Sequence, residues 1–299
     1  MENQSSACIA IVGRPNVGKS TVLNKLIGEK IAIVSKKPQT TRTRIMGVLT
    51  KGEYQMVFLD TPGLLKPRNP LGDYMVRSIT AALEEVDACL LVTEAGAPVS
   101  KADQELVERF RRGGLPAILA INKIDLLADK SPLMEQIAAY SQLYDFEAVV
   151  PVSARSGDGM EALLDELKAL AQPGGWLFDE DTLTDQPERV LAAEMVREKA
   201  LRLLDQEIPH GVAAVTEIMK EEGGLLELHV TLYCEKPNHK GILIGKGGAM
   251  LKQIGSAARV DLERFFGCKV NLQLWVKVKE DWRQRPETLQ GLGFSEQKW

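Results

Sequence analysis

The segment Gly13–Ser20, which reads Gly-Arg-Pro-Asn-Val-Gly-Lys-Ser, constrains the fold of this chain more than any other part of the sequence. It follows the apolar run Ala7–Val12 and leads into the amphipathic stretch Ser20–Ile27, which predicts a strand, a tight loop and a helix. In a G-x-x-x-x-G-K-[ST] loop, backbone N–H groups surround phosphate oxygens, the lysine adds positive charge and the hydroxyl joins a Mg²⁺ shell. We therefore expect a phosphate-binding loop, formed by Gly13, Asn16, Val17, Gly18, Lys19, Ser20 and Thr21.

Short apolar runs alternate with amphipathic stretches over residues 1–172. The apolar runs are continuous, which is typical of parallel strands that are covered on both faces. The sequence therefore predicts an α/β domain at residues 1–172, built on a mainly parallel six-stranded sheet. The expected strands are Ala7–Val12, Arg44–Leu49, Gln55–Asp60, Ala88–Val92, Ala117–Asn122 and Ala148–Val152, and the expected helices are Ser20–Ile27, Leu71–Glu84, Lys101–Arg112, Pro132–Tyr144 and Gly159–Ala171.

A D-x-x-G tetrapeptide ends the third expected strand. The carboxylate of Asp60 can hold Mg²⁺ through water there, and the N–H of Gly63 can contact a γ-phosphate. The tetrapeptide alone is weak evidence, but ligands of open α/β sheets bind at the carboxyl ends of the strands. Its position after the phosphate loop therefore favours a nucleotide-dependent switch, made of Asp60, Thr61, Pro62 and Gly63.

Two further motifs follow the fifth and sixth expected strands. The carboxylate of Asp125 can accept two hydrogen bonds from guanine N1–H and N2–H₂, and adenine would leave that carboxylate unpaired. The stem of Lys123 can cover the base plane, and the N–H of Ala154 can face guanine O6. We therefore expect a guanine site, formed by Asn122, Lys123, Asp125, Ser153 and Ala154.

The alternation of strands and helices stops at Pro173-Gly174-Gly175, and residues 173–186 are predicted to be a linker. Residues 187–285 then show the order α-β-β-α-α-β of a small α+β domain, and residues 286–299 form a tail. The expected elements are Pro187–Gln206, Val212–Met219, Leu225–Cys234, the short apolar segment Ile242–Ile244, Ala249–Phe266 and Cys268–Val278.

A glycine-rich loop, Gly245-Lys246-Gly247-Gly248, precedes the long helix of this second domain. Glycines let a backbone approach nucleotide phosphates closely, and the following helix directs its N-terminus at them. A helix-capping turn is the alternative for such a loop. Trp275, Phe265 and Phe266 are assigned to the core because they fit the apolar faces of their strand and helix; a platform on which bases stack is the alternative. The loop resembles that of the KH RNA-binding module, and this resemblance implies RNA contacts at Ile244, Gly245, Lys246, Gly247, Gly248, Lys252, Trp282 and Arg283.

The net charge of −4 hides two regions of opposite sign. Residues 173–235 hold five Lys and Arg against fourteen Asp and Glu, whereas residues 236–285 hold eleven against four. A concentrated basic region beside the glycine-rich loop is the pattern expected for contacts to a phosphate backbone. The four cysteines lie far apart and are predicted to be free thiols, and the longest apolar runs are too short to cross a bilayer. We therefore expect a cytoplasmic protein.

The motifs together resemble one family. The string GRPNVGKS, the segment PQTTR at 38–42, and D-x-x-G and N-K-x-D in that order are similar to the Era family of bacterial ribosome-assembly GTPases. The segment Val276–Arg283 and the tail near Leu289–Phe294 extend the similarity over nearly the whole chain. The resemblance implies a P-loop GTPase domain, with GTP and GDP as ligands, followed by a KH domain of type II.

The same resemblance carries further expectations. It implies a monomer that binds the 3′ end of 16S ribosomal RNA through the KH domain and assists maturation of the 30S subunit, with peripheral contact to the inner face of the cell membrane. It places the Mg²⁺-binding threonine of the first switch in PQTTR, at Thr41 or, as the alternative, Thr40. Leu64 stands where other GTPases have a water-orienting glutamine, so slow unaided hydrolysis is expected. Related GTPases hold a potassium ion with an asparagine at the position of Asn16, so a K⁺ site is expected there; a loop-shaping role is the alternative.

Two other functions compete with a GTP-controlled RNA-binding switch. An RNA chaperone or scaffold, in which hydrolysis is incidental, would bind RNA equally well with GTP, GDP or no nucleotide. A membrane-surface GTPase would use the basic region to contact anionic lipid.

Overall fold

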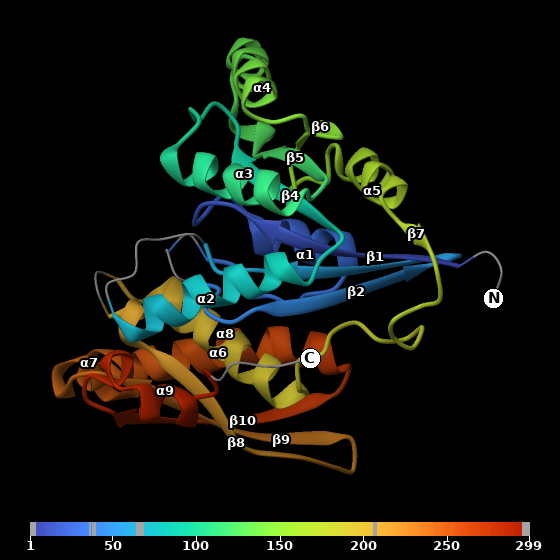
Figure 1. Ribbon diagram of the computed structural model, residues 1–299. Coiled ribbons are helices and arrows are strands. Elements are labelled where there is room, and N and C mark those ends of the chain that lie inside the picture. Colours follow the sequence, from blue (N-terminus) through green and yellow to red (C-terminus); the bar gives the residue numbers. More distant parts are fainter. Residues whose placement is uncertain (1–3, 36, 38–39, 64–68, 206–207, 295–299) are drawn as a thin grey trace. The chain divides into compact units, whose positions relative to one another are not determined.

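The computed structural model describes residues 4–35, 37, 40–63, 69–205 and 208–294 (Figure 1). By their contacts, the residues divide into two compact units, of which the first comprises Met1–Ala32, Thr41–Lys66 and Met75–Asp185 and the second Ile33–Thr40, Pro67–Tyr74 and Gln186–Trp299. Each unit is described by itself. Pro38 and Gln39 of the PQTTR segment, and Leu64, lie outside the described residues.

The first unit is built on a seven-stranded sheet of order β2-β3-β1-β4-β5-β6, with β7 beside β1. All pairs are parallel except β2 with β3 and β7 with β1. The expected α/β class and mainly parallel sheet are confirmed, and the sheet gains a seventh strand of two residues, which is too short to show a period in the sequence. The strands are β1 (Ser5–Val12), β2 (Ile45–Lys51), β3 (Tyr54–Asp60), β4 (Ala88–Glu94), β5 (Ala117–Asn122), β6 (Ala148–Val152) and β7 (Gln172–Pro173).

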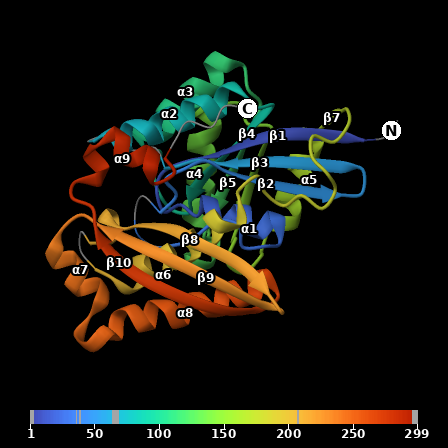
Figure 2. The same cartoon turned by 90° about the horizontal axis from the view of Figure 1, so that it is seen from below.

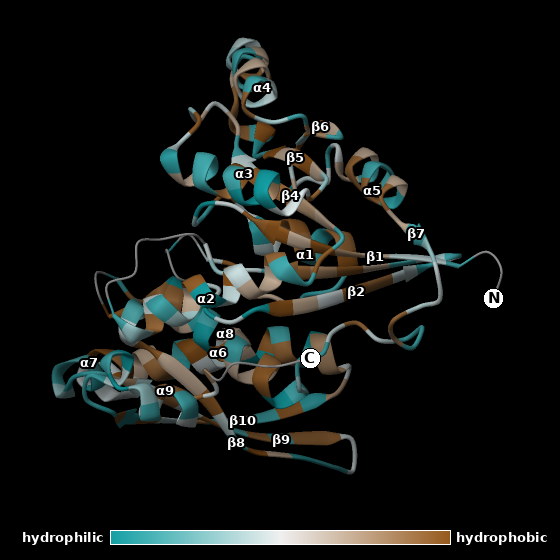
Figure 3. Ribbon diagram, in the orientation of Figure 1, coloured by the Kyte–Doolittle hydropathy of each residue, from teal (hydrophilic) through white to brown (hydrophobic). Residues whose placement is uncertain are grey.

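Helices cover both faces of this sheet, so that the apolar strands between them are buried (Figure 3). On one face, Ile79 of α2, Phe110 of α3 and Tyr140 of α4 pack on Leu91 and Leu119 in one buried cluster. On the other face, α1 and α5 pack against the strands and against each other. The helices are α1 (Lys19–Ile27), α2 (Pro70–Glu84), α3 (Lys101–Gly113), α4 (Ser131–Leu143) and α5 (Met160–Ala169).

The second unit has the expected order α-β-β-α-α-β, to which the short helix α9 is added. Its sheet has the order β10-β9-β8, with β9 antiparallel to β8 and parallel to β10 (Figure 2). Apolar side chains of α6, α8 and the three strands form its core. The elements are α6 (Glu188–Leu203), β8 (Ala213–Glu222), β9 (Leu225–Cys234), α7 (Pro237–Ile244), α8 (Ala249–Phe266), β10 (Lys269–Val278) and α9 (Pro286–Gly291). Short 3₁₀ turns lie at Ile124–Leu126, Pro209–Gly211, Lys246–Gly248 and Trp282–Gln284.

Two tryptophans of the second unit differ from their predictions. Trp282, expected to contact RNA bases, is completely buried; its indole N–H donates to the carbonyl of Gly211 at 2.9 Å, and its ring stacks on Phe294. Trp275, expected in the core, is 41% exposed. Side chains alternate between the two faces of a strand, and in β10 Val270 and Val276 face the core, which directs Trp275 outward.

In the described part of the chain, all four cysteines are free thiols. No described helix combines the length and apolar character needed to cross a membrane. Among the same residues, His, Cys, Asp and Glu side chains form no group of three that could hold a metal. An ion held by serine and threonine hydroxyls would not appear in such a group.

The two tryptophans make opposite predictions for stability. Trp282→Ala removes a fully buried ring and its hydrogen bond, so we expect it to lower the free energy of unfolding by about 3–5 kcal/mol. Trp275→Ala, which shortens a partly exposed side chain, should lower it by about 1 kcal/mol or less. Urea unfolding of the full chain, followed by circular dichroism, measures both; equal losses would contradict the two burial assignments.

Candidate functional site

The loop between β1 and α1 carries the phosphate-binding motif. Gly13 has a φ of +146°, and a Cβ there would lie 2.3 Å from the carbonyl oxygen of Val92; at Gly18, with a φ of +102°, it would lie 2.2 Å from Nδ2 of Asn122. Only glycine fits both positions, and the loop thereby brings its backbone to the N-terminus of α1. Lys19 is buried and donates to the carbonyls of Gly13 and Arg14 at 3.1 and 2.9 Å. Burial lowers the pKa of Lys19 to about 8, against an opposing effect of Asp60.

Three side-chain oxygens converge beside this loop. Ser20 Oγ donates to Asp60 Oδ2 at 2.6 Å and lies 2.9 Å from Thr41 Oγ1, which is 3.5 Å from the same carboxylate oxygen. Asp60 is completely buried, and its Oδ1 has no hydrogen-bond partner among the described residues. Burial raises the pKa of Asp60 to about 6, although Lys19 and the two hydroxyls oppose the rise. A carboxylate and two hydroxyls are ligands that Mg²⁺ accepts, and the unpaired buried oxygen fits a site completed by a cation.

The two candidate threonines of the first switch differ in their surroundings. Thr41 belongs to the oxygen cluster, whereas Thr40 Oγ1 donates to the carbonyl of Lys37 at 2.6 Å. The segment Ile33–Thr40 belongs to the second unit, where α6 holds its backbone. Val34 N–H donates to Glu198 at 2.9 Å, Arg202 donates to the Val34 carbonyl, also at 2.9 Å, and Arg197 donates to the Thr40 carbonyl.

The D-x-x-G segment lies against the phosphate loop. Thr61 donates through its hydroxyl to the carbonyl of Ile11 at 2.9 Å, which fixes the segment to β1, and Pro62 is buried. A Cβ on Gly63 would lie 2.7 Å from the nitrogen of Pro15. The glycine therefore lets the backbone of the segment approach the loop closely.

Asn122 connects the two remaining nucleotide motifs to the phosphate loop. Its amide donates to the carbonyl of Val17 at 2.8 Å, and its oxygen accepts the N–H of Ala154 at 3.0 Å. If Ala154 N–H also donated to guanine O6, as expected, it would be shared between that atom and the amide oxygen of Asn122. Asp125 accepts a hydrogen bond from Ser153 Oγ at 2.7 Å. Lys123, in the left-handed region with a φ of +69°, pairs with Glu94 at 2.8 Å.

The glycine-rich loop of the second unit joins α7 to α8. Gly245 has a φ of +73° with an extended ψ, which is accessible essentially only to glycine, and a Cβ there would lie 2.8 Å from the backbone nitrogen of Met250. Gly247 and Gly248 have φ values of +59° and +82°, with open space around their Cα atoms. The loop is thus a bare backbone at the N-terminus of the 18-residue helix α8.

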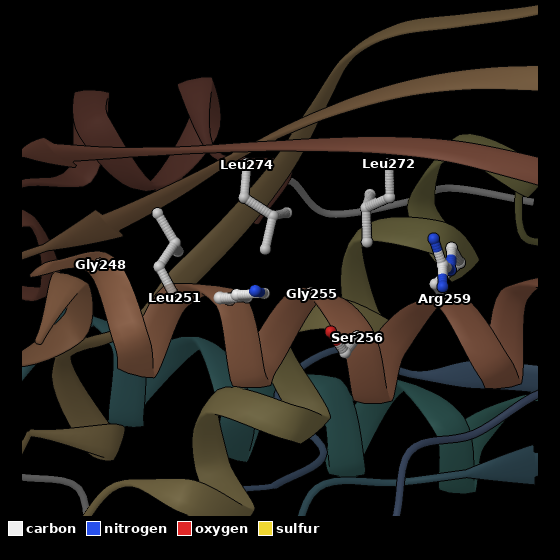
Figure 4. A pocket seen from close by; sticks show the side chains of 8 residues that line it. Gly248, Leu251, Gly255, Ser256, Arg259, Leu272 and Leu274 are labelled. Atoms are coloured by element: carbon white, nitrogen blue, oxygen red, sulfur yellow. The ribbon is translucent and has the colours of Figure 1, made fainter.

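A groove of about 310 Å³ starts at this loop and follows α8 along β10. Figure 4 shows Leu272 and Leu274 of β10 directed towards the helix, from which Leu251 and Arg259 project into the same space. A Cβ on Gly255 would lie 3.2 Å from Leu274, so this glycine lets strand and helix approach. The groove combines an apolar floor with cationic and hydroxyl groups. Its lining residues are Gly248, Leu251, Lys252, Gly255, Ser256, Arg259, Leu272 and Leu274.

The structure brings together the nucleotide motifs within the first unit and Gly248 with Lys252 at the groove. Trp282 is buried, and neither it nor Arg283, which forms a two-pronged ion pair with Glu235, lines the groove. The groove residues missing from the sequence prediction are Leu251, Gly255, Ser256, Arg259, Leu272 and Leu274. The groove residues on α8 recur three or four positions apart after Gly248, as expected for one face of a helix, and this spacing could have predicted them.

This fold and these sites define a P-loop GTPase domain joined to a KH domain. Residues 8–123 match a family model described as a 50S ribosome-binding GTPase, and residues 207–283 match the KH domain model. The chain is 48% identical over 294 residues to "GTPase Era" of Ruminiclostridium cellulolyticum, covering 98% of each chain, and 45% identical over 293 residues to that of Clostridioides difficile, covering 97% and 99%. The chain belongs to the Era family of GTPases.

Two solved structures are similar over almost the entire chain. One is Era in complex with MgGDPNP and nucleotides 1506–1542 of 16S ribosomal RNA, and the other is a single-residue variant of Aquifex aeolicus Era bound to GDP.AlF4⁻. Each has a TM-score of 0.94 and 38% sequence identity, and the match covers 98% of this chain and all of that one.

The raised pKa of Asp60 predicts a pH effect in protein free of metal and nucleotide. A carboxyl that binds its proton more tightly when folded stabilises the protein below its unfolded pKa of 3.8, and this contribution is lost as the pH rises through about 6. Relative to Asp60→Asn, the wild type should therefore gain about 2 kcal/mol between pH 7 and pH 4. Urea unfolding in EDTA measures the difference. Asp129→Asn, at an exposed carboxyl whose pKa is lowered, is the control and should show no such gain on acidification.

Proposed function

We propose that this protein is a GTP-hydrolysing switch that binds the 3′ end of 16S ribosomal RNA through its KH domain and assists 30S subunit assembly. The observation that carries the proposal is that one chain combines the phosphate, Mg²⁺ and guanine motifs of a nucleotide site with a glycine-loop groove. The relative solved with MgGDPNP and 16S ribosomal RNA nucleotides supports both ligands. We assign residues 1–172 to the GTPase domain, 173–186 to the linker, 187–285 to the KH domain and 286–299 to the tail.

The phosphates of GTP would lie on the loop Gly13–Thr21, where backbone N–H groups and the ammonium of Lys19 stabilise negative charge. Ser20, Thr41 and, through water, Asp60 would hold Mg²⁺, which neutralises charge on the β- and γ-phosphates. Thr41 takes this role in preference to Thr40 because its hydroxyl already lies beside Ser20 and Asp60. The N–H of Gly63 would contact the γ-phosphate.

The carboxylate of Asp125 would accept hydrogen bonds from the guanine base. Ser153 Oγ donates to this carboxylate at 2.7 Å and orients it. Asn122 is a positioning residue, since its two hydrogen bonds fix the phosphate loop and the Ser153-Ala154 turn in one geometry. The stem of Lys123 would cover one face of the base. An adenine would leave the carboxylate of Asp125 without its donors, which is the basis for discrimination.

The contacts of α6 suggest how GTP binding and hydrolysis would change the position of the segment held by the RNA-binding unit. Thr41 follows directly after Thr40, whose carbonyl accepts from Arg197, a side chain that is 1% exposed. Drawing Thr41 towards a γ-phosphate would pull on this carbonyl, and release after hydrolysis would return it to α6. A two-state segment whose position depends on the γ-phosphate is a common basis for switching in GTPases.

The RNA would enter the groove between α8 and β10. The glycine loop would lie against phosphates and Leu251, Leu272 and Leu274 against unstacked bases, while Lys252 and Arg259 add positive charge. Ile244, Gly245, Lys246, Gly247 and Gly248 would form the end of the groove that holds the backbone.

Finer parts of the proposal concern K⁺, oligomeric state and location. Asn16 is exposed, with a φ of +65°, on the phosphate loop, and its amide oxygen is suited to a monovalent cation that adds positive charge at the phosphates. We further propose a monomer that works in the cytoplasm, with peripheral contact to the inner face of the membrane through its basic region.

RNA binding can be tested with Lys246→Asp combined with Gly247→Asp. Two carboxylates would face the RNA phosphates, and aspartate tolerates the left-handed backbone of Gly247. We expect a loss of affinity of about tenfold or more for an RNA of nucleotides 1506–1542 in fluorescence anisotropy. Lys130→Asp with Gly114→Asp, at an exposed lysine and a glycine of φ +60°, is the matched control. Equal losses in both variants would contradict the assigned groove.

The switch is tested by the ratio of RNA affinities with a GTP analogue and with GDP. We expect a ratio different from one in the wild type and closer to one in Arg197→Ala, which frees the Thr40 carbonyl. Arg189→Ala is the control, because that arginine of α6 donates to Thr216 instead. A wild-type ratio of one, also without nucleotide, would favour an RNA scaffold.

The K⁺ assignment predicts faster GTP hydrolysis in KCl than in NaCl at equal ionic strength. Asn16→Ala should remove this difference, because the amide oxygen is lost. Phosphate release in the two salts measures it, and equal wild-type rates would remove the assignment.

A further inference from the structure

The outward face of β10 carries a row of side chains that the groove does not use. Side chains of a strand alternate between its faces, so residues 269, 271, 273, 275 and 277 point away from α8 and the core. The structure shows all five exposed. They are Lys269, Asn271, Gln273, Trp275 and Lys277, and Lys279 follows.

Trp275 is the centre of this row. Its side chain is 41% exposed, which is unusual for an aromatic ring on an ordered strand and leaves part of the indole open to a partner. His229 of β9 lies beside it, with ring centroids 4.9 Å apart and the planes at 52°. Glu227 holds His229 through a hydrogen bond of 2.8 Å, so the indole is supported on this side.

The chemistry of the row favours an anionic partner with flat rings. It contains three lysines, two amides and one indole, and no acidic residue. On the neighbouring β9, the carboxylate of Glu227 is already paired with His229, and the ammonium of Lys279 lies 5.6 Å from the ring centroid of Tyr233. Aromatic rings between cationic side chains are typical of surfaces that bind single-stranded nucleic acid, where each base has a face for stacking.

The position of the row connects it to the groove. β10 is an edge strand, and Leu272 and Leu274 line the groove on its inner side. Gln273 and Trp275, their direct neighbours in the chain, lie on the outer side. A strand of RNA leaving the groove would therefore need to pass only around the edge of β10 to reach them.

We propose that the outward face of β10 is a second contact surface for single-stranded RNA, on which one base stacks on Trp275 and Lys277 contacts a neighbouring phosphate. The inference rests on the proposed RNA binding and extends it to a nucleotide beyond those in the groove. KH glycine loops clamp about four backbone nucleotides, and the outer surface would add affinity for a longer strand.

The test uses the full chain with a GTP analogue and a fluorescein-labelled RNA of nucleotides 1506–1542. Trp275→Ala should weaken binding roughly 5- to 100-fold, the range for one stacked base, whereas Trp275→Phe should keep most of the affinity. Ile218→Ala is the matched control, because it shortens an outward side chain that is 36% exposed on β8, two strands away. Affinity of Trp275→Ala equal to that of the control would overturn the proposal.

Two further readouts separate stacking from a structural role. RNA should quench part of the tryptophan fluorescence of the wild type, and this part should be missing in Trp275→Phe; identical quenching in both proteins would overturn the proposal. Lys277→Ala should reduce the slope of log affinity against log salt by about one, and Lys220→Ala on β8 should leave it unchanged.

The outcomes also distinguish this inference from the function on which it rests. Loss of binding in Lys246→Asp/Gly247→Asp with no effect of Trp275→Ala would retain the groove and reject the outer surface. Binding that neither variant weakens would reject both.

Discussion

The buried carboxylate of Asp60 is the group around which the nucleotide site is arranged. A carboxylate removed from water is unfavourable unless charges or hydrogen bonds compensate for the loss of solvation. Here Ser20 and Thr41 supply hydroxyls and Lys19 supplies charge, yet in the described part of the chain one carboxylate oxygen of Asp60 has no hydrogen-bond partner, and its pKa rises to about 6. The site is thus least favourable without a cation, and Mg²⁺ with GTP would supply what it lacks.

This constraint links distant parts of the sequence. Ser20 begins α1, Asp60 ends β3, and Thr41 lies between them in a segment whose preceding residues belong to the second unit. A change in the ion or the γ-phosphate would therefore act on Thr41 and, through the peptide bond that precedes it, on the Thr40 carbonyl that Arg197 holds. The coupling requires no long chain of contacts.

The sequence was sufficient for the nucleotide motifs because each is a short run at the end of a buried strand. The order of elements in both units followed from their hydrophobic periods, and strands β5, β6 and β9 begin and end where the pattern predicts. The burial of two tryptophans was predicted wrongly. The burial of Trp282 depends on Gly211, 71 residues away, so no local pattern reveals it. The exposure of Trp275 could have been predicted from the alternation in β10, in which Val270 and Val276 face the core, but Trp275 was assigned to the apolar face of the strand.

The lysines of β10 have a consequence apart from any ligand. An edge strand presents unpaired N–H and C=O groups, and a flat apolar edge would invite pairing with another copy of the chain. Lys269 and Lys277 would face each other in an antiparallel pairing of two such edges centred on Gln273, and each would face its own copy in a parallel in-register pairing, so both pairings bring like charges together. The same side chains would therefore keep an aromatic surface open to solvent while protecting the sheet from self-association.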